Sequence, residues 1–104
     1  MDTRSQIDQL VRCIVESVHP LRIVLFGSAA RGEVGPDSDL DLLIVMPEGA
    51  HRRHTAQRLY QTIRGVSIPF DFVVVTPSDL VRQGRNPGLL YHRILPEGRT
   101  LYDA

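Results

Sequence analysis

Three short apolar segments constrain the fold of this chain more than any other feature of its sequence. They span residues 23–26, 42–46 and 72–75, and each is rich in the branched side chains that favour a buried β-strand. Around them, apolar residues recur at three- and four-residue steps, which is the period of an amphipathic helix. Strands that alternate with helices in this way predict an α/β domain.

The periodicity and the turn residues together give an expected order of elements. Helices are expected over residues 3–18, over the arginine-rich stretch that ends at Gly65, from Thr76 to about Gln83, and over residues 89–95. Strands are expected over residues 21–26, 40–46, 66–75 and 99–102. The first two of these strands are expected to pair as neighbours.

Size and composition exclude several classes of protein. The chain has 104 residues, of which 42% are apolar and 23% charged, and this suits one compact soluble domain over residues 1–104. Its apolar segments are far shorter than the roughly 18 residues that could span a bilayer, so no membrane association is expected. The first residues lack a secretory signal and Cys13 is the only cysteine, so a cytoplasmic location without an intramolecular disulfide is expected.

Charge is balanced overall but segregated along the chain. Twelve arginines, with no lysine, offset twelve acidic residues, which argues against direct nucleic-acid binding because that requires a positive excess. Residues 32–47 contain four acids and no base, whereas residues 49–70 contain no acid and four arginines, Arg52, Arg53, Arg58 and Arg64. We interpret this arginine stretch as a solvated helix face, with contact to phosphates or to an acidic partner as the alternative. His51 and His54, in the same stretch, are interpreted as surface residues.

Two carboxylates in the acidic stretch predict a cation site. Side chains alternate between the two faces of a strand, so Asp39 and Asp41 point to the same face, about 6.5–7 Å apart along the backbone. Like charges held so close destabilise the fold unless a cation or a proton neutralises them, and oxygen ligands suit Mg²⁺ or Mn²⁺ better than Zn²⁺. The alternative is that both residues mark the solvent face of a half-exposed strand.

A third carboxylate, Asp71, lies within an otherwise apolar expected strand. An acid is seldom buried in such a segment without a partner. If this strand lies beside the second strand, Asp71 completes a triad able to hold two metal ions about 3.5–4 Å apart, an arrangement that activates an attacking oxygen and stabilises a leaving phosphate. The alternative is a strand-end or edge residue near Pro69.

The end of the first strand carries a second candidate feature. Gly27 and Ser28 lie where the strand ends and a short helical turn is expected to begin, so that backbone N–H groups point outward. Such a turn could cradle a triphosphate, although an ordinary strand-to-helix turn has the same composition. Arg31 could neutralise phosphate charge or pair with a neighbouring aspartate.

The complete string of motifs is more specific than any part of it. Gly27-Ser28 is followed after ten residues by Asp39-Leu40-Asp41, with Arg31-Gly32 and Ser38 between them and Asp71 on a later strand. This pattern resembles the nucleotidyltransferase superfamily of DNA polymerase beta, and in particular its small stand-alone bacterial branch, the minimal nucleotidyltransferases. The resemblance extends over the chain and implies a mixed, twisted sheet with flanking helices in a single small domain.

The resemblance also implies roles for individual residues. The catalytic, metal-binding acids would be Asp39, Asp41 and Asp71, and the nucleotide-binding residues would be Gly27, Ser28, Arg31 and Ser38. The implied reaction is nucleotidyl transfer, in which a hydroxyl attacks the α-phosphate of a nucleoside triphosphate and pyrophosphate leaves. The implied cofactor is Mg²⁺, with Mn²⁺ as the alternative, and the implied co-substrate is ATP.

The acceptor implied by the resemblance is a partner protein. Larger members of the superfamily add domains that hold the acceptor, and no such region is expected in this chain. Minimal nucleotidyltransferases typically act as antitoxins of a helical ribonuclease toxin of the HEPN class. The resemblance therefore implies transfer of AMP to a tyrosine of that toxin and allows a hetero-oligomer with it. Two alternatives stay open: a non-catalytic antitoxin that neutralises its partner by binding, and nucleotidyl transfer to a small hydroxylated molecule.

Overall fold

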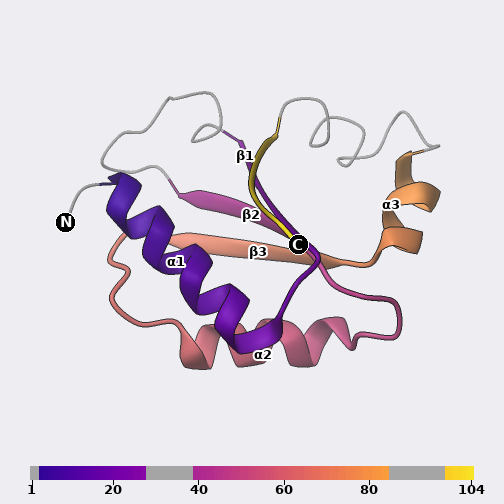
Figure 1. Cartoon of the computed structure of the whole chain (residues 1–104), viewed down its shortest axis with the longest axis horizontal. Helices are drawn as coiled ribbons and strands as arrows, with labels where there is room; N and C mark the ends of the chain where they lie inside the picture. The colour runs from indigo at the N-terminus through magenta and orange to yellow at the C-terminus, as the bar shows by residue number, and fades with distance from the viewer. Residues whose placement is uncertain (1–2, 28–38, 85–97) are drawn as a thin grey trace.

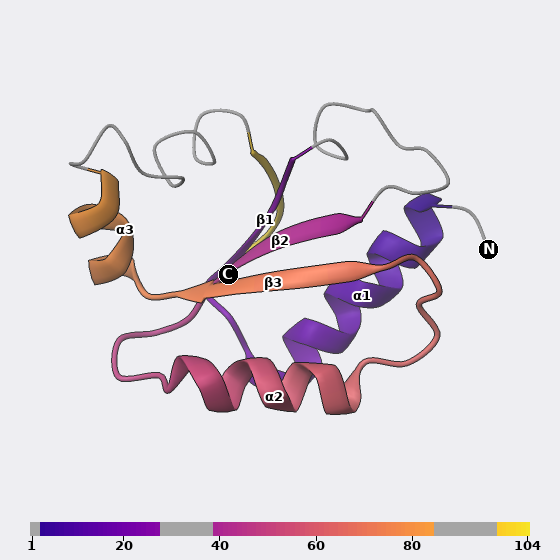
Figure 2. The same cartoon turned by 180° about the vertical axis from the view of Figure 1, so that it is seen from behind.

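The computed structural model describes residues 3–27, 39–84 and 98–104. Over these residues the elements are α1 (Thr3–Val18), β1 (Arg22–Phe26), β2 (Leu40–Val45), α2 (Arg52–Thr62), β3 (Phe70–Val75), α3 (Pro77–Gly84) and β4 (Arg99–Asp103). Figure 1 shows α1 and α2 on the same side of the sheet and α3 beyond the end of β3, and Figure 2 shows the same arrangement from behind. The alternation of strands and helices predicted from the sequence is confirmed.

The four strands form one mixed sheet in the order β3-β2-β1-β4. β1 is antiparallel to both β2 and β4, whereas β2 and β3 are parallel and joined through α2. The predicted pairing of the first two strands is therefore confirmed. The condition stated for the third strand, that it lies beside the second, is met. β1 and β2 occupy the centre of the sheet, and β3 lies at one edge of its described part.

The main hydrophobic core lies between the sheet and the two longer helices. It is built from buried residues of α1, α2 and the strands, including Leu10, Ile14, Leu59, Ile63, Ile23, Leu25, Leu40, Leu42, Ile44 and Val74. The even-numbered residues of β2 and β3 thus face the helices. Because side chains alternate along a strand, the odd-numbered residues of β2 and β3 face the other side of the sheet.

That second side carries a smaller apolar cluster. Val24, Leu43, Val45 and Val75 are buried there, and Phe26, Val73 and Leu80 pack against them. The cluster extends from the end of the sheet where β2 and β3 finish to Phe26, which pairs with Asp41. At the starts of β2 and β3, on the same side, the odd-numbered residues are Asp41 and Asp71.

The third strand is shorter than the sequence indicates, since β3 begins at Phe70 and not at Val66. Gln6 on α1 explains the difference. Its Oε1 atom accepts hydrogen bonds from the backbone N–H of Ser67 (2.7 Å) and of Ile68 (3.0 Å) and from the Ser67 hydroxyl (3.0 Å). Pro69 has no N–H to donate to a ladder. Ser67 and Ile68 are therefore anchored to α1 and do not join the sheet, whereas the Pro69 carbonyl already accepts a hydrogen bond from the Leu40 N–H of β2 at 2.8 Å.

The helices agree closely with the predicted ranges, with one shorter end. α2 ends at Thr62, three residues before Gly65, because Ile63 adopts an extended conformation while its N–H still bonds to the Leu59 carbonyl. The helix predicted over residues 89–95 lies outside the described residues. In the described part of the chain, no helix has the length and apolar character that a membrane crossing requires.

Asp79 fixes the start of α3. Its Oδ2 atom accepts a hydrogen bond from the Thr76 N–H (3.0 Å), and its own N–H bonds to the Thr76 hydroxyl (3.4 Å), which together form a capping box. Arg52 on α2 (3.4 Å) and Arg82 (2.8 Å) also contact the carboxylate. The hydrogen bond from the Thr76 N–H is the main reason that the pKa of this buried carboxyl is below its usual value, and the Thr76 side chain, Arg52 and Arg82 lower it further against the opposing effect of burial.

Candidate active site

Asp41 and Asp71 are direct partners in the parallel pairing of β2 and β3. Neighbouring strands lie about 4.8 Å apart, and partners in a parallel pair project to the same side of the sheet. Asp39 precedes β2 by one residue and lies two positions before Asp41, so strand alternation places it on that side as well. The fold therefore brings together the backbone positions of the three acids that the sequence singled out.

The electrostatics of Asp41 show that the three carboxylates interact. The pKa of Asp41 is raised above its usual value, first because the group is partly buried and then because the negative charges of Asp39 and Asp71 lie near it. A raised pKa means that the charged form is disfavoured. A divalent cation would relieve both causes, because it replaces lost solvation and offsets the mutual repulsion of the carboxylates.

Gly27 forms the wall of this acidic site at the end of β1. Its φ is +77°, a backbone conformation that glycine adopts without strain. A Cβ atom at this position would lie 2.8 Å from Oδ2 of Asp41, closer than side-chain atoms normally approach one another. Glycine is therefore required twice here, for the turn that follows Phe26 and for the space that the Asp41 carboxylate fills.

Asp71 differs from Asp41 in being exposed at the edge of the sheet. Its Oδ1 atom accepts a hydrogen bond from the Tyr60 hydroxyl at 2.7 Å and another from the Phe72 N–H at 2.9 Å. Partial burial and the bond to Asp71 raise the pKa of Tyr60 to about 12. The sequence analysis did not identify this contact, because no local pattern links a helix residue to a strand residue eleven positions later.

A divalent cation fits the donor set of this site, but the side chains do not form a finished cage. Among residues 3–27, 39–84 and 98–104, no three His, Cys, Asp or Glu side chains converge on one metal position. The Asp71 carboxylate is directed in part to Tyr60 by the hydrogen bond just described. Carboxylate oxygens are the ligands that Mg²⁺ and Mn²⁺ prefer. The chemistry of the three acids therefore suits such an ion, and their assignment as its ligands remains a prediction.

Three of the predicted nucleotide-binding residues lie outside the described part of the chain. They are Ser28, Arg31 and Ser38, so the structure describes the proposed phosphate-holding turn only at Gly27. At that residue the backbone lies close to the Asp41 carboxylate, and the role of the turn in phosphate binding stays a prediction.

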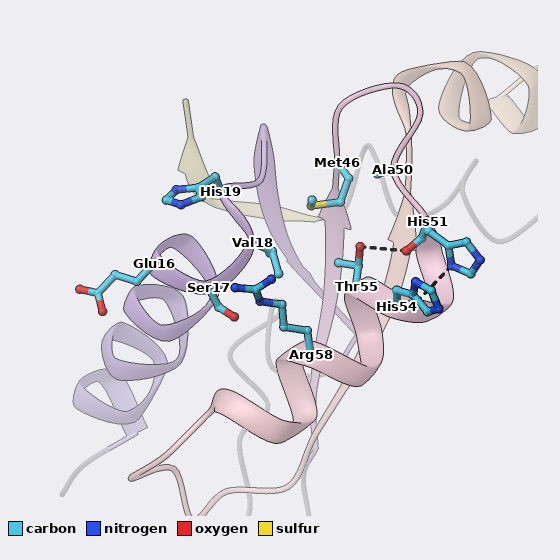
Figure 3. Close-up of a pocket in the computed structure, with 10 residues that line it drawn as sticks. All are labelled: Glu16, Ser17, Val18, His19, Met46, Ala50, His51, His54, Thr55 and Arg58. Carbon is cyan, nitrogen blue, oxygen red and sulfur yellow. Dashed lines mark hydrogen bonds between the residues drawn. The ribbon is translucent and has the colours of Figure 1, made fainter.

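A cleft lies at the opposite end of the sheet from the three acids. This cleft of about 410 Å³ separates the end of α1 from the start of α2, and its lining includes His19, His51, His54 and Arg58 but none of the three acids. Figure 3 shows Arg58 extending from α2 toward α1. His51 acts as the N-cap of α2, since its Nδ1 atom accepts a hydrogen bond from the His54 N–H at 3.2 Å. The two histidines are exposed and stacked on one another, as expected for surface residues.

The predicted solvated face of the arginine-rich helix is also observed. The side chains in question are all exposed: Arg52, Arg53, Arg58 and Arg64. Arg52 pairs with Asp79 and Arg64 donates to the neighbouring Ile63 carbonyl at 3.3 Å. A solvated face therefore accounts for the positions of these four arginines.

The chain matches the model of a protein family described as a nucleotidyltransferase domain, over residues 7–96. No curated protein matches it. Among solved structures, a Sulfolobus solfataricus protein assigned provisionally as a nucleotidyltransferase is 26% identical, with 78% of this chain and 82% of that chain covered and a TM-score of 0.49. A toxin-antitoxin structure with AMP-PNP is 19% identical, with 99% of this chain and 75% of that chain covered and a TM-score of 0.52, which shows a likeness in fold. Because the family model covers most of the sequence, the chain belongs to the nucleotidyltransferase domain family, and the resemblance drawn from its motifs is confirmed.

Proposed function

We propose that this protein is a metal-dependent nucleotidyltransferase that transfers AMP from ATP to a tyrosine hydroxyl of a partner toxin of the HEPN class and thereby acts as its antitoxin. One observation carries the catalytic part of the proposal. Asp41 and Asp71 are in-register partners on parallel strands, with Asp39 close enough for its charge to reach Asp41. Such a concentration of carboxylates beside a glycine turn suits a site for cations and phosphates.

The three acids and Gly27 have distinct tasks in the proposed reaction. Asp39, Asp41 and Asp71 would hold Mg²⁺ or Mn²⁺, which when bound would neutralise phosphate charge. Gly27 leaves room for the Asp41 carboxylate and keeps backbone close to the site. The acceptor hydroxyl releases its proton to solvent as its oxygen forms a bond to the α-phosphorus, the bond from that phosphorus to the bridging oxygen breaks, and pyrophosphate leaves. Catalysis of this kind depends on positioning and charge neutralisation, so no protein nucleophile is needed.

The proposal of a toxin as acceptor has different support. The family match covers residues 7–96, so nearly all of the described chain belongs to the transferase domain itself. The toxin-antitoxin structure with AMP-PNP shares the fold of this chain. A small transferase of this kind can use the surface of a bound partner to present the acceptor. The HEPN class of the toxin and its tyrosine as the acceptor are both implied by the resemblance to minimal nucleotidyltransferases.

The test uses ATP labelled at the α-phosphate and measures transfer of the label to the proposed partner, a toxin encoded next to the gene for this protein. We expect the partner to become labelled on tyrosine and to lose its toxicity. The double variant Asp39→Asn with Asp41→Asn should transfer no label while keeping its fold. The matched control is Glu16→Gln with Asp103→Asn, which removes two exposed carboxylates at the other end of the sheet, where Glu16 lies near the end of α1 and Asp103 pairs with Arg22.

Three results would contradict the proposal. Label transfer that persists in the Asp39 and Asp41 double variant would show that the site is wrong. Full neutralisation of the toxin by that variant, without modification, would favour inhibition by binding alone. Turnover with a small hydroxylated acceptor in the absence of any protein partner would favour a small-molecule transferase.

A further inference from the structure

Tyr60 lies on α2 at the edge of the sheet, where its ring packs against two aromatic side chains of β3. Its ring centroid is 6.0 Å from that of Phe70, with nearly parallel planes, and 5.0 Å from that of Phe72. Phe70 and Phe72 are themselves 5.3 Å apart. We call these three residues the aromatic cluster. Phe70 and Phe72 face the helix side of β3, whereas Asp71 projects to the other side. The Tyr60 hydroxyl can bond to Asp71 because β3 lies at the edge of the described sheet.

The Tyr60 hydroxyl donates to the carboxylate that the family reaction requires. The bond to Asp71 Oδ1 is 2.7 Å long, and the same oxygen also accepts from the Phe72 N–H. Both described hydrogen bonds of the carboxylate thus converge on one oxygen atom. An exposed aspartate on an edge strand would otherwise sample several rotamers. Two donors on Oδ1 restrain the carboxylate and leave Oδ2 without a hydrogen-bond partner among the described residues.

We propose that Tyr60 is a positioning residue for the acidic site: it holds Asp71 by Oδ1 so that Oδ2 is presented to a divalent cation shared with Asp41. The inference rests on the proposed function, since it assigns Asp71 to the cation site. Carboxylates that bind metal ions are themselves commonly held by hydrogen bonds from neighbouring residues, and loss of such a partner typically weakens metal binding or activity 10–100-fold, as an order of magnitude.

A purely structural role for Tyr60 makes a different prediction. The side chain is 49% exposed, so its hydroxyl contributes little to the core, and the packing of the aromatic cluster belongs to the ring. Tyr60→Phe therefore keeps the ring contacts and removes only the bond to Asp71. If the residue were merely structural, this change would leave cation affinity and turnover unaltered.

The experiment compares Tyr60→Phe with the wild-type chain in two measurements. Mn²⁺ binding to the free chain is followed by electron paramagnetic resonance, and AMP transfer is separated into kcat and the KM for ATP. We expect roughly tenfold weaker Mn²⁺ binding and a lower kcat, with little change in KM. The control is Tyr102→Phe, the same chemical change on β4, where Tyr102 pairs with Ile23, away from the Phe26 end of β1 that pairs with Asp41. It should leave both quantities unchanged.

A second measurement on the wild-type chain does not depend on the folding of any variant. Bound Mn²⁺ should broaden the ring signals of Tyr60 in NMR spectra and affect those of Tyr102 much less. Equal or tighter Mn²⁺ binding by Tyr60→Phe would overturn the inference, since tighter binding would show that the tyrosine competes with the cation. Absence of AMP transfer by a wild-type chain that binds Mn²⁺ would instead contradict the proposed function, and a wild-type chain that binds no Mn²⁺ would contradict both.

Discussion

A Cβ atom at Gly27 would lie 2.8 Å from Oδ2 of Asp41, so the end of β1 and the start of β2 meet at a point where only hydrogen fits. An alanine at Gly27 would have to displace the carboxylate and would also be strained at a φ of +77°. We expect Gly27→Ala to reduce AMP transfer by at least about tenfold, as misplacement of a reacting group does. Steady-state transfer assays measure this loss.

The backbone strain in that variant has a matched control in Gly65→Ala. Gly65 has a φ of +79°, but the atoms nearest to its added Cβ belong to Gln9 and are 3.8 Å away, an ordinary contact. The strain at positive φ should cost both variants more than about 1 kcal/mol, and Gly27→Ala should lose further stability through its contact with Asp41. If Gly65→Ala impaired transfer as much as Gly27→Ala, the close approach to Asp41 would not be the cause.

Asp41 is expected to reduce the stability of the cation-free protein at neutral pH. Its pKa in the folded chain is raised above the value of 3.8 that applies when unfolded, so the folded state binds more protons between the two values. The free energy of unfolding must then fall as the pH rises from the unfolded to the folded pKa of Asp41, and this stability is not regained at higher pH. Without divalent cations, Asp41→Asn should therefore be more stable than the wild type at pH 7, and the difference should vanish in acid.

Urea unfolding at pH 7 and near pH 3 in the presence of a chelator measures this difference. Asp103→Asn on β4, an exposed carboxylate away from the site, should change stability little at either pH. If Asp41→Asn were less stable than the wild type at pH 7 in the presence of the chelator, groups other than those described would have to stabilise the carboxylate.

Asp79→Ala is expected to destabilise the protein by roughly 1–2 kcal/mol at neutral pH, since the Thr76 N–H loses its acceptor. The pKa of Asp79 is lowered in the folded state, so its contribution is present above the unfolded value and is lost as the pH falls through the folded one. Urea unfolding should show the gap between variant and wild type closing in acid. Arg82→Ala, at a side chain that is 72% exposed, should cost at most about 1 kcal/mol.

Gln6→Leu tests the anchor that keeps residues 67 and 68 out of the sheet. Gln6 is 7% exposed, and its loss leaves two backbone N–H groups without their acceptor, which should cost roughly 2–3 kcal/mol in the free energy of unfolding. Gln9→Leu, one turn later on α1, removes weaker contacts to Arg64 and Cys13 and should cost much less. Equal losses of stability in the two variants would show that the hydrogen bonds of Gln6 to residues 67 and 68 contribute no more than the contacts of Gln9.

The parts of the fold set by local pattern were predictable from the sequence. Alternation and periodicity located β1, β2, α1 and α3 within one or two residues, and the spacing of Asp39 and Asp41 placed them on one side of a strand. The adjacency of Asp71 to Asp41 depended on which strands pair, and the sequence could state this only as a condition. The resemblance to a known family supplied what the local pattern lacked.

Contacts between distant segments could not be predicted in this way. The N–H groups of Ser67 and Ile68 look available for a strand until the position of Gln6 is known. Tyr60 reads as an ordinary member of an apolar stripe until β3 is packed beside α2, when its hydroxyl meets Asp71. In both cases a helix side chain contacts a backbone or carboxylate group of a distant segment. The spacing of apolar residues does not indicate such contacts.

The most direct test of the cation site is the melting temperature of the protein with and without Mg²⁺ and ATP, in the wild type and in Asp71→Ala. A ligand present at about 100 times its Kd adds roughly 2.7 kcal/mol to stability. We therefore expect a rise of several degrees or more for the wild type, and little or none for Asp71→Ala. An equal rise in both proteins, or none in the wild type, would contradict the account that Asp39, Asp41 and Asp71 form one site.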